Sequence, residues 1–273
     1  MTAHTAVEFE TADAMPEECA AALRNLLVAI ADTKLLLGYH YGEWTFGPPE
    51  LEAAIAGCSL CQTELGHVRL VHGILKRHFG ADPDRLLEGR GPAEFASVAY
   101  LDRDLGDWAR LVAANYVVDL ALTRLLHALQ GSAFAPLRMS LEKMVDEERY
   151  HIHHGQGWFR TLCGKNEECR AAVQEAVREA LDSVLHWFGP ADEAGDRALV
   201  EAGIKSRTNA EVVRDLLQDV RSAAEPLGVQ IEVEVPQDVP GWDPVRRRAD
   251  GSGPDEEILY HLRGSKNQIY KLK

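Results

Sequence analysis

Two short motifs in the sequence place a histidine three residues after a glutamate. They begin at Glu64 and Glu148 and end at His67 and His151. Residues three apart on an α-helix lie about one turn apart on the same face, so each motif could offer one metal ion a carboxylate and an imidazole. Both motifs lie inside segments with a clear apolar stripe, where an unpaired charge is costly to bury. We therefore interpret them as candidate metal ligands.

Asp119 is a third acidic residue in an apolar setting, within residues 111–122. A buried carboxylate at this position needs a partner. The midpoint between Asp119 and Glu148 falls beside a Gly-Ser break, so in an antiparallel hairpin these two residues would share a level. The same test on the preceding hairpin places Asp32 opposite Glu64, and Lys34 fits almost as well.

Carboxylates from two helices, combined with E-x-x-H motifs on two others, form the ligand pattern of ferritin-like dimetal carboxylate bundles. The predicted ligands are Glu64, His67, Asp119, Glu148 and His151, with Asp32 as a sixth candidate. Asp32 is equally compatible with a salt-bridged acid in the core. This donor set suits iron, with two ions per chain expected and one possible, or manganese as the alternative, whereas zinc sites are more often rich in Cys or His.

Long amphipathic helices must position these residues. Apolar residues recur at helical spacing in four long segments, separated by glycine and proline breaks. These segments cover residues 17–45, 49–78, 108–129 and 136–162. They predict an all-α, ferritin-like antiparallel four-helix bundle.

The rest of the chain divides around this bundle. A long connection is expected over residues 82–104, and further helices are expected over 167–188 and 209–226. Alternation of apolar and polar residues at 229–235 predicts one short β-strand, followed by an irregular tail. The expected organisation is an N-terminal extension (1–15), a helical domain (16–228) and a C-terminal strand with its tail (229–273).

Composition excludes several classes of protein. The chain has 273 residues, of which 46% are hydrophobic, and no uncharged apolar run approaches the length of a membrane span. The formal net charge of −14 argues against nucleic-acid binding, because such a field repels phosphate backbones. An odd number of cysteines, 5, and a start without a secretory pattern predict a cytoplasmic protein.

In these motifs, and over most of its length, the chain resembles the ferritin-like subunits of the bacterial multicomponent phenylacetyl-CoA epoxidase. That family pairs a catalytic diiron subunit with a related structural subunit that has lost its metal ligands, and this chain is similar to both. The segments that carry the resemblance are 42–44, 62–67, Asp119, 146–151, 187–190 and 227–236. The first helix looks more like the structural subunit, and Lys34 stands where the catalytic subunit has a ligating Glu.

The resemblance implies a diiron oxygenase subunit that activates dioxygen to oxidise an aromatic acyl-CoA in phenylacetate catabolism. It also implies a homologous sister subunit, a flavin and iron–sulfur reductase, and a homo- or hetero-oligomer. One alternative is a non-catalytic structural subunit in which Lys34 forms an ion network with Glu64, Asp119 and Glu148. Another, on fold alone, is a ferritin-type iron oxidase. Three consecutive arginines at 246–248 could meet the phosphates of CoA, but a solvated loop is the favoured interpretation.

Overall fold

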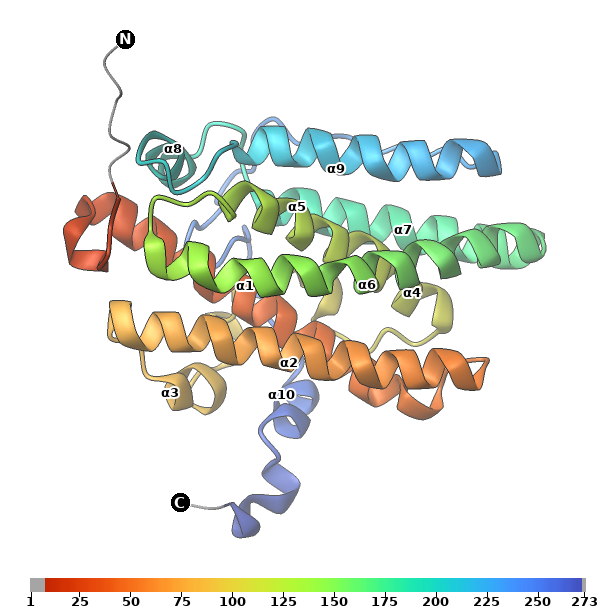
Figure 1. The fold of residues 1–273 in the computed structure, drawn as a ribbon. Helices are drawn as coiled ribbons and strands as arrows, with labels where there is room; N and C mark the ends of the chain where they lie inside the picture. The colour runs from red at the N-terminus through yellow and green to blue at the C-terminus, as the bar shows by residue number, and fades with distance from the viewer. Residues whose placement is uncertain (1–7, 272–273) are drawn as a thin grey trace.

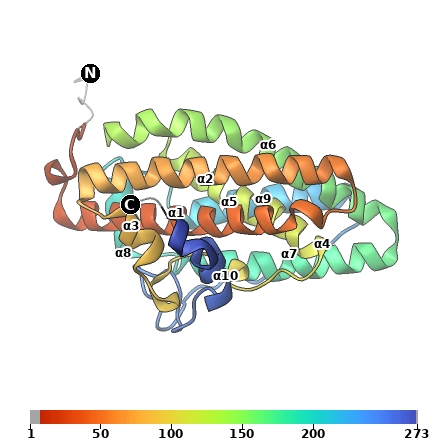
Figure 2. The same cartoon turned by 90° about the horizontal axis from the view of Figure 1, so that it is seen from below.

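Four long helical segments build the molecule, as the computed structural model of residues 8–271 shows (Figures 1 and 2). They are α1 (Glu17–Glu43), α2 (Leu51–Phe79), the segment α4–η5–α5 (Trp108–Ala113, Ala114–Val118 and Asp119–Leu129) and α6 (Ala135–Lys165). Their ends lie within a few residues of the expected ones, because each break coincides with a glycine or proline in the sequence. The all-α, ferritin-like bundle is confirmed.

Further helices surround this bundle. The expected helices are α7 (Glu167–Phe188) and α9 (Asn209–Ala224), and three short helices were not expected: α3 (Pro83–Glu88), α8 (Ala194–Glu201) and α10 (Glu256–Leu262). The predicted strand at 229–235 is wrong. Within residues 8–271 the only β pairings are two isolated bridges elsewhere. Val229 and Ile231 are buried against the helical core, so the alternating pattern marks a single segment packed on helices rather than a sheet.

The most apolar long helix, Trp108–Leu129, runs through the centre of the molecule. Among the residues described here it alone is long and apolar enough to span a membrane, but 89% of its most apolar window is buried inside the protein. It contacts α6, α7 and α9 (Figure 1). Its composition is thus explained by its place as the core helix.

Residues Ala114–Val118 form a π-helical turn within this central helix. Such turns are rare and are frequently found at functional sites. Gly155 of α6 faces the turn so closely that a Cβ there would lie 2.9 Å from Asn115 Oδ1 and 2.9 Å from the backbone of Tyr116. The absence of a side chain at Gly155 therefore lets α6 approach the turn that precedes Asp119.

We expect Gly155→Ala to lower the free energy of unfolding by about 1–3 kcal/mol, because the added methyl group overpacks a tight helix contact. Gly157→Ala on the same helix is the matched control. A Cβ at Gly157 would meet no atom within 4 Å, so this variant should be as stable as wild type or slightly more stable. Urea denaturation measures both. Equal stability of the two variants would contradict the close approach.

The connection 82–104 is held against the bundle by buried polar contacts. His40 Nε2 of α1 donates to the carbonyl of Leu101 at 2.9 Å, and Trp187 Nε1 of α7 donates to the carbonyl of Ala96 at 2.7 Å. Its length therefore reflects a packed layer rather than a free loop.

Acidification tests the His40 contact. Burial lowers the pKa of His40, and the hydrogen bond to Leu101 only partly offsets this effect. The contribution of neutral His40 to the free energy of unfolding is therefore complete above about pH 6.5, and it is lost as the pH falls through the lower pKa of the folded state. We expect the stability difference between wild type and His40→Gln, from urea denaturation, to be smaller at pH 5 than at pH 8. A stability difference that grows on acidification would contradict this prediction.

The arginine triplet has a structural role, so the solvated-loop interpretation is wrong for two of its members. Arg248 Nη1 donates to Asp102 at 2.6 Å, and Arg247 Nε donates to the carbonyl of Trp187 at 3.0 Å, near the end of α7. Both side chains are buried. The C-terminal residues thereby close over the 82–104 connection and the end of α7.

Candidate functional site

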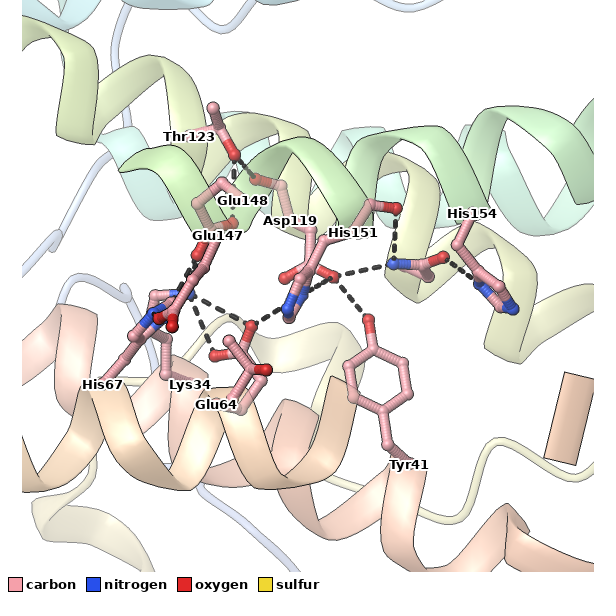
Figure 3. A network of polar contacts seen from close by, with 12 residues as sticks. Lys34, Tyr41, Glu64, His67, Asp119, Thr123, Glu147, Glu148, His151 and His154 are labelled. Carbon is pink, nitrogen blue, oxygen red and sulfur yellow. Dashed lines mark hydrogen bonds and ion pairs between the residues drawn. The ribbon is translucent and has the colours of Figure 1, made fainter. Parts of the chain in front are cut away.

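The two E-x-x-H motifs and Asp119 meet at the centre of the bundle, where α2, α5 and α6 face one another (Figure 3). Glu64, Asp119, Glu148 and His151 each offer one donor atom, and these atoms all lie within 4.8 Å of one another. All four side chains are buried. The level test on the sequence therefore paired Asp119 with Glu148 correctly.

Lys34 of α1 lies between the two glutamates of this cluster. Its Nζ atom lies 2.9 Å from Glu64 Oε2 and 2.7 Å from Glu148 Oε1, and the side chain is fully buried. The ammonium group thus bridges the glutamates of the two motifs (Figure 3). A lysine donates hydrogen bonds here and cannot ligate a metal while it is protonated.

The two histidines bind the same carboxylates. His151 Nδ1 lies 3.0 Å from Glu64 Oε1 and 3.3 Å from Asp119 Oδ2. His67 Nδ1 lies 3.2 Å from Glu148 Oε1, and its Nε2 lies 2.8 Å from Glu147 Oε2 at the edge of the cluster.

Four residues that sequence reasoning did not select complete the polar network. Tyr41 OH and Asn115 Nδ2 donate to Asp119 Oδ2 at 2.5 and 2.8 Å, and Thr123 Oγ1 donates to Glu148 Oε2 at 3.1 Å. Glu147, beside a predicted ligand in sequence, is the fourth. Asn115 and Thr123 lie four residues either side of Asp119, so helical spacing from a buried acid was a usable signal.

Asp32 does not join the cluster. It accepts from Arg90 Nη1 and Nη2 at 2.9 and 2.5 Å and from the backbone N–H of Ala96 at 2.9 Å. Asp32 lies two positions before Lys34, which is about 200° around a helix, so the two side chains point to opposite sides. Of the two interpretations of Asp32, the structure supports the salt-bridged acid of the core, and this acid faces the 82–104 connection.

Electrostatics favours the charged forms of Lys34, Glu148 and His151, whereas burial raises the pKa of the Glu64 carboxyl group above its usual value. Burial alone would lower the pKa of Lys34, but Glu148, Glu64 and Asp119 together raise it above its usual value. Burial opposes ionisation of Glu148 too, yet Lys34 and the histidines hold its pKa well below the ordinary range. Burial would also lower the pKa of His151, but Asp119 and Glu64 raise it to about 10. The carboxyl groups of Glu64, Asp119 and Glu148 therefore face two cations, Lys34 and the protonated His151.

A pair of divalent ions does not fit the residues as placed. Lys34 Nζ already occupies hydrogen-bonding positions on Glu64 and Glu148, the glutamates that would hold the ions. Two divalent ions beside its ammonium would also leave excess positive charge over three carboxylates in a buried site. One ion is compatible with the donor set, since Asp119 Oδ1 and His151 Nε2 are buried without a hydrogen-bond partner.

Fold and site together define a ferritin-like protein whose carboxylate and histidine cluster encloses a lysine. The chain belongs to the family described as phenylacetic acid catabolic protein, whose model matches residues 1–240. It is similar to one of the subunits of 1,2-phenylacetyl-CoA epoxidase from Escherichia coli (strain K12). The two are 28% identical over 176 residues, which cover 64% of this chain and 70% of the relative.

Proposed function

We propose that this chain is a non-catalytic partner subunit of an oxygenase of the phenylacetyl-CoA epoxidase type. In this proposal a related sister subunit holds the diiron centre and activates dioxygen to oxidise an aromatic acyl-CoA. A flavin and iron–sulfur reductase supplies the electrons. The buried ion cluster of this chain stabilises the shared bundle fold without metal.

One observation supports this proposal above the others: the ammonium of Lys34 lies between Glu64 and Glu148, at 2.9 and 2.7 Å. These two carboxylates are predicted ligands that a diiron site would need. Lys34 and His151 compensate the negative charge of these carboxylates without a metal ion. The relative from Escherichia coli is named as one subunit of an epoxidase, which agrees with a role inside a larger enzyme.

Metal analysis tests the proposal directly. We expect chain purified after growth with iron and manganese to contain far less than one ion of either metal per chain by plasma mass spectrometry. We also expect no consumption of dioxygen when the chain is mixed only with the reductase and phenylacetyl-CoA. Adding the diiron sister subunit should produce consumption, and omitting this chain should abolish it. Near two irons per chain would overturn the proposal.

A second candidate is a site for one iron or manganese ion, favoured by the four donor atoms within 4.8 Å. The ion would be held by Glu64, Asp119, Glu148 and a neutral His151, while Lys34 remains. About one ion per chain in wild type, lost in the double variant Glu148→Ala and His151→Ala, would establish this alternative. Full metal content in the double variant would exclude this site.

A further inference from the structure

A short segment at the C-terminal side of α10 projects from the bundle. Residues 263–271, which we call the arm, extend away from the long helices (Figure 1). Ile269 and Tyr270 on the arm are 85% and 76% exposed. Its base is fixed, because Leu259 of α10 is buried and Arg263 Nε donates to the carbonyl of Leu87 at 3.2 Å.

The arm is also basic. It contains Arg263, Lys266 and Lys271 and no acidic residue, although the whole chain carries a net charge of −14. Lys271 Nζ binds Glu88 Oε1 at 2.6 Å, which holds the far end of the arm on its own subunit. The arm is therefore an anchored projection that displays two large apolar side chains beside positive charge.

A second group of exposed apolar side chains lies at the turn between α1 and α2. Phe46, Leu51 and Ile55, which we call the turn patch, are 99%, 72% and 63% exposed. Single exposed apolar residues are ordinary, but three large ones within ten residues are typical of a contact surface. Leu51 and Ile55 are one helical turn apart and share a face of α2.

The turn patch is acidic where the arm is basic. Exposed glutamates at 43, 50 and 52 flank it, and no Lys or Arg occurs between Lys34 and Arg69. Two copies of a chain with net charge −14 repel each other unless opposite charges meet locally. The arm and the turn patch provide this complementarity, with apolar side chains at the centre of each.

We propose that the arm of one copy docks on the turn patch of a second copy. In a two-fold dimer the contact forms twice, because each chain presents both surfaces. Ile269 and Tyr270 would pack against Phe46, Leu51 and Ile55, and Lys266 would face the flanking glutamates.

Sedimentation equilibrium of the full chain tests the proposal. Wild type is expected to be a dimer, and Ile269→Asp with Tyr270→Asp should raise its dissociation constant by roughly 30-fold or more, the effect of losing a central contact. Met139→Asp is the matched control, since Met139 is 72% exposed but lies on α6. It should leave the dimer unchanged. Circular dichroism checks that each variant keeps its helices.

Charge reversal gives the sharper result. One variant carries Lys266→Glu and Gln268→Glu in the arm, and the other carries Glu50→Lys and Glu52→Lys beside the turn patch. Each alone should be monomeric, and their equimolar mixture should form dimers, because both contacts regain opposite charges. A monomeric wild type, association only with a different subunit, a dimer insensitive to arm and patch, or a mixture without dimers would overturn the proposal.

Discussion

Lys34→Met is expected to lower the free energy of unfolding by ~3–5 kcal/mol, the usual cost of removing one partner from a buried ion pair. Lys34 is the buried cation in contact with both Glu64 and Glu148. Without it, these two carboxylates retain His151, His67 and Thr123 but lose their shared counter-charge. Urea denaturation at neutral pH measures the loss. A change below about 1 kcal/mol would show that the network does not stabilise the fold.

A second buried lysine gives this experiment its control. Lys205 is also fully buried, and its Nζ binds Asp196 and lies 2.7 Å from Asn209 Oδ1. Lys205→Met should be destabilised to a similar degree, and iron(II) or manganese(II) should not restore its stability. Lys34→Glu should respond differently, because it adds a fourth carboxylate to the cluster. We expect these ions to raise its unfolding temperature. No metal response in Lys34→Glu would contradict the interpretation of Lys34 as a replaced ligand.

Arg90→Met is expected to have the other large effect, a loss of ~3–5 kcal/mol in the free energy of unfolding. Its guanidinium binds both oxygens of Asp32, and both side chains are buried. The variant leaves Asp32 with the N–H of Ala96 as its remaining hydrogen bond. It should also loosen the 82–104 connection, which limited proteolysis would detect as new cleavage there.

Arg85→Met is the control for this variant. Arg85 pairs with Glu94 at 3.9 Å, but the side chains are 73% and 50% exposed. Exposed pairs contribute little, so a change within about 0.5 kcal/mol is expected. If both arginine variants lost equal stability, the buried Asp32 pair would have no special role.

The sequence by itself determined the helices and most of the cluster. Helical periodicity and helix-breaking residues are local, so α1, α2, α6 and α7 were predicted to within a few residues. Glu64, Asp119, Glu148 and His151 were selected because acids and histidines on the apolar face of a helix need partners. Hairpin symmetry then placed Asp119 level with Glu148, and the structure brings all four residues together.

Only the tertiary structure decided which residue of α1 enters the cluster. Asp32 and Lys34 are almost equivalent by level along the helix, but they face opposite sides of it. Arg90 binds Asp32, and Lys34 on the opposite side of the helix then faces the glutamates. Arg90 belongs to a connection whose path could not be predicted from periodicity. The same reason explains why the strand predicted at 229–235 is wrong and why the burial of Arg247 and Arg248 was not predicted. Their partners are distant in sequence, and local pattern carries no information about which remote surface a segment will meet.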